Sequence, residues 1–212
     1  MPTPSSPHLA LADWRRRVAA LYRDVRDGSG TAAARLEAFR AARDELFGAH
    51  PSSPVPAGQR SSFAGLAYFD RDEALVRSAV LEPDPDAPPL DVPRSGDGLG
   101  IPFRRIGWVS FEIGETASRL AVFWLDEYAG GIFIPFRDGT SGTETYGGGR
   151  YLWDSAKGAD LGTDGDALVL DFNYAYHPSC THDPIWSCPL APRENWLTTP
   201  IRGGERLASD HA

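Results

Sequence analysis

The sequence predicts a mainly β fold of the α+β class: an antiparallel β-barrel or sandwich of about seven strands, preceded by an N-terminal helical hairpin. Apolar residues recur at helical spacing between residues 11 and 48. After Pro51, short runs rich in β-branched and aromatic residues alternate with Gly, Pro and Asp. The 212 residues, 42% of them hydrophobic, suffice for one substantial core. We therefore expect a hairpin over residues 1–50, packed on or appended to a β domain over residues 51–212.

Two helices account for the first segment. The first presents one apolar face, made of Trp14, Val18, Leu21, Tyr22 and Val25. Glycines at 28 and 30 interrupt the pattern, and Thr31 is placed to cap the second helix. The second helix carries an apolar stripe made of Leu36, Phe39, Ala42 and Leu46, and ends near Gly48. Its exposed face is a candidate interface for homo- or hetero-oligomers.

Strands follow in order along the β domain. We predict them at Ser62–Phe69, Ala74–Leu81, Phe103–Ile113, Arg119–Glu127, Gly131–Arg137, Arg150–Asp154 and Ala167–Tyr176. Between the second and the third lies an acidic, proline-rich segment, residues 82–98. Because proline cannot donate to a β-ladder, we expect this segment to be an exposed excursion or a flap.

Charge and composition exclude several classes of function. A net charge of −8 and a pI near 5.1 disfavour nucleic-acid binding, which needs clustered basic residues. No apolar run approaches the roughly 20 residues that cross a bilayer, and the N-terminus lacks the order of a secretory signal. We therefore expect a cytoplasmic protein that contacts neither nucleic acid nor membrane.

Residues 137–151 form a loop of glycines and hydroxyl residues with an arginine near each end. Its short hydroxyls are hydrogen-bond donors suited to a polar ligand, and Arg137 and Arg150 add forked cationic donors suited to carboxylate or phosphate. Thr140 and Ser141 are the hydroxyls we assign to binding. The alternative is a long hairpin connection with solvated side chains.

The last predicted strand alternates between an apolar and a polar face. Leu168, Leu170 and Phe172 fall on one side, and Asp171 and Asn173 on the other. On an open sheet these two polar residues would be ordinary surface groups. Inside a barrel, Asp171 would be a desolvated carboxylate able to act as acid, base or ligand.

Histidines and cysteines crowd the next segment, which contains His177, Cys180, His182, Asp183 and Cys188. The spacing of the cysteines does not match zinc fingers or ribbons, so we assign no metal and keep Cys180, His182 and Cys188 as fallback ligands. A Cys180 thiolate assisted by a histidine is a second interpretation, and a packed loop with two buried thiols is a third.

Three motifs, FRDGTSGTETYGGGRYL, DFNYAYHPSC and CPLAPRENWLTTPIRGGER, resemble the DUF1684 proteins, a widespread bacterial family of unassigned function. The resemblance covers roughly Phe103 to Arg206. It implies a predominantly β domain and no established substrate or cofactor. The residues that carry it are Arg137, Asp138, Thr140, Ser141, Glu144, Tyr146, Arg150, Asp171, Asn173, Cys180 and Cys188. His177 departs from the family pattern, where asparagine is expected.

These observations predict a small-molecule enzyme that acts on an anionic metabolite by hydrolysis, elimination or intramolecular substitution, without a cofactor. Its pocket would lie between the 137–150 loop and residues 171–182. Asp171, His177 and Glu144 would transfer protons, and the substrate would be bound by Arg137, Asp138, Thr140, Ser141, Tyr146, Arg150 and Asn173. One alternative is a non-catalytic metabolite-binding or protein-assembly module. In another, the charged residues pair internally and are architectural.

Overall fold

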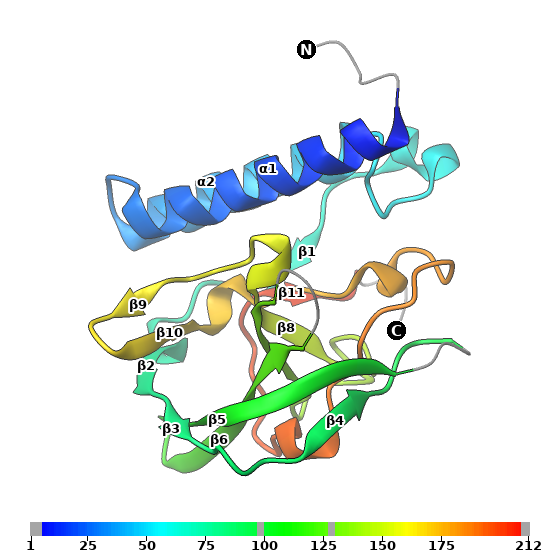
Figure 1. The fold of residues 1–212 in the computed structure, drawn as a ribbon. Helices are drawn as coiled ribbons and strands as arrows, with labels where there is room; N and C mark the ends of the chain where they lie inside the picture. The colour runs from blue at the N-terminus through cyan, green and yellow to red at the C-terminus, as the bar shows by residue number, and fades with distance from the viewer. Residues whose placement is uncertain (1–5, 97–99, 127–129, 209–212) are drawn as a thin grey trace.

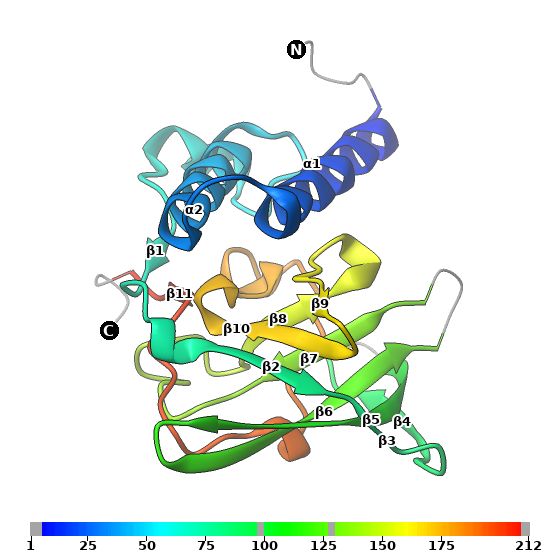
Figure 2. The same ribbon diagram turned by 90° about the vertical axis from the view of Figure 1, so that its left-hand side faces the viewer.

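A computed structural model describes residues 6–96, 100–126 and 130–208 of the chain. Two antiparallel helices, α1 (Pro7–Asp27) and α2 (Ala32–Ala49), form a layer across one side of the β body (Figures 1 and 2). Thr31 caps α2, since its hydroxyl accepts a 3.2 Å hydrogen bond from the backbone of Ala34. The predicted hairpin is confirmed, and α1 begins earlier than expected because Pro7 suits the first helical position.

Within the part of the chain that the structure describes, three antiparallel sheets build the β body. The largest has the order β3-β5-β6-β7-β8, with β4 also paired to β5; the strands are β3 (Glu82–Pro83), β4 (Pro89–Val92), β5 (Ile101–Ile113), β6 (Thr116–Leu125), β7 (Ile132–Phe136) and β8 (Arg150–Asp154). A second sheet has the order β2-β10-β9, from β2 (Val76–Val80), β10 (Ala167–Asp171) and β9 (Thr163–Asp164). The short pair β1 (Ala67–Tyr68) and β11 (Glu205–Arg206) lies between the helical layer and the larger sheet (Figure 1). Within the described residues the sheets do not close into a barrel, so the architecture is the open, sandwich-like form of the predicted α+β fold.

One hydrophobic core joins the helices to both larger sheets. It contains Tyr22 and Phe39 from the helices, Leu170 from β10 and Leu152 from β8, all at most 4% exposed. Tyr22 and Phe39 pack edge to face, with ring centroids 5.2 Å apart. The hairpin is thus packed on the β domain and shares its core.

The predicted seventh strand ends sooner than expected. β10 stops at Asp171, and Phe172–Tyr174 form a 3-10 turn. The Asp171 side chain causes this break, because its Oδ1 accepts a hydrogen bond from the backbone of Asn173 at 3.0 Å. The predicted alternation over Ala167–Tyr176 is therefore wrong beyond Asp171, and Asn173 does not share a strand face with it.

Two further segments differ from prediction. Of Ser62–Phe69, only Ala67 and Tyr68 are strand. The acidic segment is not a free excursion, because β3 and β4 pair with β5 and Val92 is fully buried. Pro83 and Pro89 are tolerated because they lie in short strands at the margin of the sheet, and the other prolines of the segment lie between or after these strands. Residues 97 and 98 of that segment, and Glu127 of the fourth predicted strand, lie outside the described residues.

Candidate functional site

The 137–150 loop folds on itself. Asp138 Oδ1 accepts hydrogen bonds from the backbone and the hydroxyl of Thr140, at 2.6 and 2.5 Å. The Thr140 hydroxyl also meets that of Thr145 at 2.9 Å, and both threonines are fully buried. Ser141 Oγ accepts a hydrogen bond from the backbone of Asp138 at 3.1 Å. The hydroxyls of Thr140, Thr145 and Ser141 therefore stabilise the loop itself.

Arg150 has internal partners on several sides. Its Nη2 pairs with Asp138 Oδ2 at 2.6 Å, and the two side chains are 1% and 0% exposed. The guanidinium also donates to the carbonyls of Ile201, Gly203 and Glu205. This geometry favours the architectural interpretation of Arg150 and Asp138: the pair holds the C-terminal segment against the loop.

Arg137 and Glu144 lie at the surface with separate partners. The Arg137 guanidinium stacks 4.2 Å above the ring of Trp196. Glu144 forms a two-pronged ion pair with Arg202, at 2.8 to 3.1 Å, and both side chains are solvent-accessible. The structure thus does not bring these two charges together with Arg150 around one ligand-sized space.

A second buried ion pair, absent from the sequence-based prediction, lies beside the first. Arg43 of α2 contacts Glu205, and the side chains are 4% and 2% exposed. Burial pushes the pKa of Glu205 upward, but Arg43 and His177 outweigh it and keep that pKa below its usual value. Arg43, Glu205, Asp138 and Arg150 together have no net charge; we call them the buried charge cluster.

His177 connects the loop to this cluster. Its Nε2 accepts a hydrogen bond from the backbone of Tyr146 at 3.2 Å, so the ring proton resides on Nδ1, 3.8 Å from Glu205 Oε2. Its own backbone donates to the same carboxylate oxygen at 2.8 Å. Burial lowers the pKa of His177 to about 4, although Glu205 acts in the opposite direction. His177 is neutral near pH 7, and its Nε2 already has a partner.

Asp171 and Asn173 have partners of their own. Asn173 is 1% exposed and exchanges two hydrogen bonds with the backbone of Asp72, at 2.8 and 2.9 Å. Asp171 lines a cavity of about 390 Å³ with Arg71 and Tyr174. Burial raises the pKa of Asp171, against the hydrogen bonds from Asn173. His177 lines another cavity, so the structure does not join these two predicted proton-transfer groups.

The cavity beside His177 has a volume of about 460 Å³. Its walls are the chain from Val55 to Ala67, the 177–182 segment and the C-terminal residues around β11; the apolar part includes Val55, Phe63, Leu66 and Leu207, and the polar part His177, Thr181, His182, Glu205 and Arg206. Its lining includes Ala67 of β1 and Glu205 and Arg206 of β11, and these two paired strands lie beside the helical layer (Figure 1). We call it the histidine cavity.

Two residues that line this cavity each have a polar atom that is buried without a partner among the described residues: Thr181 Oγ1 and His182 Nε2. A buried polar atom without a hydrogen bond costs roughly 1–3 kcal/mol, so such atoms mark places where a ligand or water belongs. The His182 ring packs edge-on against Phe47, with centroids 5.4 Å apart. Burial lowers the pKa of His182, and Glu205 only partly opposes this. The histidine cavity therefore combines apolar walls with two polar residues, each of which has a buried atom without a partner among the described residues.

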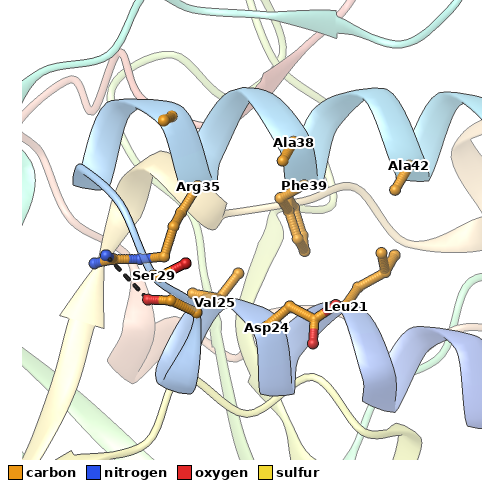
Figure 3. Close-up of a pocket in the computed structure, with 10 residues that line it drawn as sticks. Leu21, Asp24, Val25, Ser29, Arg35, Ala38, Phe39 and Ala42 are labelled. Carbon is orange, nitrogen blue, oxygen red and sulfur yellow. Dashed lines mark hydrogen bonds between the residues drawn. The ribbon is translucent and has the colours of Figure 1, made fainter.

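A different hollow, of about 360 Å³, lies between the two helices (Figure 3). Leu21, Val25 and Phe39 project into it, and Arg35 donates a 3.5 Å hydrogen bond to the carbonyl of Gly28 at one end. Arg35 is turned to this carbonyl, and the other polar side chains that line the hollow are Asp24 and Ser29, neither of which has a buried atom without a partner among the described residues. It is a weaker candidate than the histidine cavity.

The fallback metal ligands do not converge. Within the described ranges, no group of three or more His, Cys, Asp and Glu side chains is arranged to hold a metal ion. Cys180 and Cys188 are free thiols that contact each other, whereas His182 packs on Phe47. Neither of the two described helices has the length and apolarity to cross a bilayer.

The fold and the site define a class: an α+β protein with a helical layer, antiparallel sheets and a ligand-sized cavity at their junction. Residues 61–206 match the family described as a protein of unknown function, DUF1684, and the chain belongs to that family. The solution structure of an uncharacterized protein from Haloarcula marismortui is similar, with 35% sequence identity and a TM-score of 0.60 over 84% of this chain and 95% of that one. No curated protein matches the chain.

Proposed function

We propose that this protein binds a small molecule in the histidine cavity, with an apolar body against Val55, Phe63 and Leu66 and a polar group at Thr181 and His182. The observation that carries the proposal is a 460 Å³ cavity lined by Thr181 and His182, whose Oγ1 and Nε2 atoms are buried without partners among the described residues. Ligand pockets typically combine mostly apolar walls with a few placed polar groups. A hydroxyl, amide or carboxyl group would supply hydrogen bonds to both side chains once they turn toward it, since neither atom has exposed surface in the free protein.

Arg206 makes an anionic group on the ligand compatible with this cavity. Its Nε and Nη1 donate to the carbonyls of Tyr68 and Leu207, at 3.1 and 3.2 Å, which fixes the guanidinium at the cavity wall. Arg137 and Arg150 do not line this cavity, because Arg150 is engaged in the buried charge cluster and Arg137 stacks on Trp196. In this proposal Arg206 therefore takes the anion-binding role that the sequence assigned to those two arginines.

Acid–base catalysis on the bound molecule is a second candidate function, favoured by the state of His182. Burial lowers its pKa, so the ring is neutral near pH 7 and can accept a proton. His177 is less suited to that role because its Nε2 is already hydrogen-bonded. A hydrolase or lyase would use His182 as the base, and Thr181 and Arg206 to position the substrate.

Ligand-observed NMR with indole, phenol and benzamide as probes tests binding. Each probe joins an aromatic body to one hydrogen-bonding group. We expect binding to shift the His182 ring resonances, and Thr181→Val to weaken it roughly fivefold, the equivalent of one hydrogen bond of about 1 kcal/mol. Ala64→Trp places an indole at the cavity wall and should abolish binding, whereas Ala12→Trp, on an exposed face of α1, should leave it unchanged.

The binding proposal fails if all three probes leave the His182 resonances in place, or if Ala64→Trp binds them as tightly as Ala12→Trp. Catalysis is tested on whichever compounds bind. A turnover that survives His182→Phe would remove the acid–base role, while binding alone would stand.

A further inference from the structure

Cys180 and Cys188 differ in exposure, and their side chains lie within hydrogen-bonding reach of each other. Cys188 is 7% exposed, and Cys180 is partly accessible. The Cys180 thiol also donates to the phenolic oxygen of Tyr146 at 3.7 Å. Neither thiol lines the histidine cavity, and the proposed ligand-binding role uses neither.

The chain around the two thiols is held in place on both sides. The backbone of Cys188 donates to Ser95 Oγ at 2.9 Å, and its carbonyl accepts from the backbone of Ser95 at 2.8 Å. On the other side, Ser179 accepts hydrogen bonds from the backbones of His182 and Asp183, at 3.0 and 3.3 Å. These hydrogen bonds therefore fix the chain on both sides of the two thiols.

We propose that Cys180 and Cys188 form a reversible thiol–disulfide site, in which Cys180 attacks a low-molecular-weight disulfide and Cys188 completes the exchange. An accessible thiol in contact with a buried one is the arrangement that this chemistry needs, since one sulfur must meet the oxidant and the other must only meet its neighbour. Closely placed thiols of proteins in reducing compartments commonly serve such transient bonds.

The exchange balances with glutathione disulfide as the oxidant. The Cys180 thiolate attacks one sulfur, the S–S bond of the small disulfide breaks, and one glutathione leaves with the proton. The Cys188 thiolate then attacks the Cys180 sulfur, and the second glutathione leaves with the second proton. The protein loses two electrons and two protons, and the small disulfide is reduced to two thiols.

The acidities of the two thiols suit these roles. The hydrogen bond from Cys188 is the main cause that lowers the pKa of Cys180 to about 6, against the effect of burial. The same contact raises the pKa of Cys188. Once Cys180 is in a mixed disulfide it no longer carries a negative charge, so the main cause that raises the pKa of Cys188 disappears when Cys188 must attack.

Intact-mass spectrometry of the full chain, after incubation with glutathione disulfide at pH 7, tests this order of events. We expect the folded protein to become two hydrogens lighter without retaining glutathione. Cleavage before Asp183, which lies between the two cysteines, should then give two peptides joined by a disulfide. Cys188→Ala should instead retain one glutathione on Cys180, and Cys180→Ala should react at least tenfold more slowly.

Circular dichroism on both variants establishes that they are folded. The peptide analysis that locates the disulfide uses the unaltered chain and does not depend on any variant. A stable glutathione adduct on the unaltered protein, with Cys188 still reduced, would overturn the proposal. So would an unmodified Cys180 under conditions that fully oxidise a free dithiol such as dithiothreitol.

Discussion

Arg43 and Glu205, 162 residues apart in the sequence, form a buried ion pair between the helical layer and the β body. The Arg43 guanidinium also lies over the ring of Tyr176, 5.2 Å from its centroid. Glu205 accepts the backbone N–H of His177, which in turn accepts from Tyr146. A single carboxylate thus links α2, the C-terminal strand and the loop that carries the family motifs.

Removing one partner of this pair should be costly. Arg43→Met leaves Glu205 as an uncompensated buried charge, and we expect a loss of about 3–5 kcal/mol in the free energy of unfolding, measured by urea denaturation. The double variant Arg43→Met with Glu205→Gln should lose less than Arg43→Met alone, because Gln is neutral and still accepts the His177 N–H.

The exposed pair Arg202–Glu144 provides the matched control, and Arg202→Met there should cost under about 1 kcal/mol. Equal losses in the free energy of unfolding for Arg43→Met and Arg202→Met would show that burial does not determine the cost of breaking the ion pair.

Asp138 and Asp171 should respond differently to the same substitution. Asp138→Asn leaves Arg150 without its counter-charge in a fully buried site, so we expect a loss of about 3–5 kcal/mol. Burial raises the pKa of Asp171, which shows that the charged form is disfavoured there. Asp171→Asn should therefore change stability by less than about 1 kcal/mol in urea titrations at pH 7. A larger loss for Asp171→Asn would reverse this assignment.

Thr181→Val should stabilise the free protein by about 1 kcal/mol, because it removes a buried hydroxyl that has no partner among the described residues. Thr143 is the control: its hydroxyl donates to the carbonyl of Thr140 at 3.0 Å, so Thr143→Val should destabilise by a similar amount. Thermal unfolding by calorimetry distinguishes the two signs. A destabilised Thr181→Val protein would show that the hydroxyl is satisfied in the absence of a ligand.

The pKa of His177 predicts how stability depends on pH. In the unfolded chain histidine takes up a proton near pH 6.5, whereas folded His177 does so only near pH 4. Between these values the unfolded state binds more protons, so the free energy of unfolding falls as the pH is lowered from about 6.5 to about 4, by about 3 kcal/mol from this residue.

His177→Asn places the residue expected in the family at this position and should remove that part of the pH dependence. Urea titrations of both proteins at several pH values, together with an NMR titration of the His177 ring in the unaltered protein, provide the measurement. A ring that titrates near pH 6.5 in the folded protein would refute the neutral, buried assignment.

Local patterns were sufficient to predict most of the elements. The helical hairpin, its Thr31 cap and β8 follow from apolar periodicity and turn residues, which act over a few neighbouring positions. The early end of β10 was missed because an aspartate can either continue a strand or close a turn with its side chain. The pairing of β3 and β4 with β5 was missed because proline is common in loops but is also tolerated in short strands at the edge of a sheet, and the sequence does not show which strand lies at an edge.

The buried charge cluster was harder to predict because its members come from distant parts of the chain. One local sign was present: Arg43 continues the stripe of Leu36, Phe39 and Leu46 at spacings of three and four, so an arginine occupies an apolar position. Glu205 follows two glycines and carries no comparable sign. The histidine cavity likewise depends on the 55–67 chain, whose role appears only when it is folded against the 177–182 segment.

The pair between Arg43 and Glu205 also determines where the protein can be divided. The family match begins at residue 61, after both helices. A recombinant fragment that begins there would contain Glu205 without its partner Arg43. It would also expose the apolar surface of the β body that the hairpin covers. Experiments on this protein therefore need expression clones that include both helices.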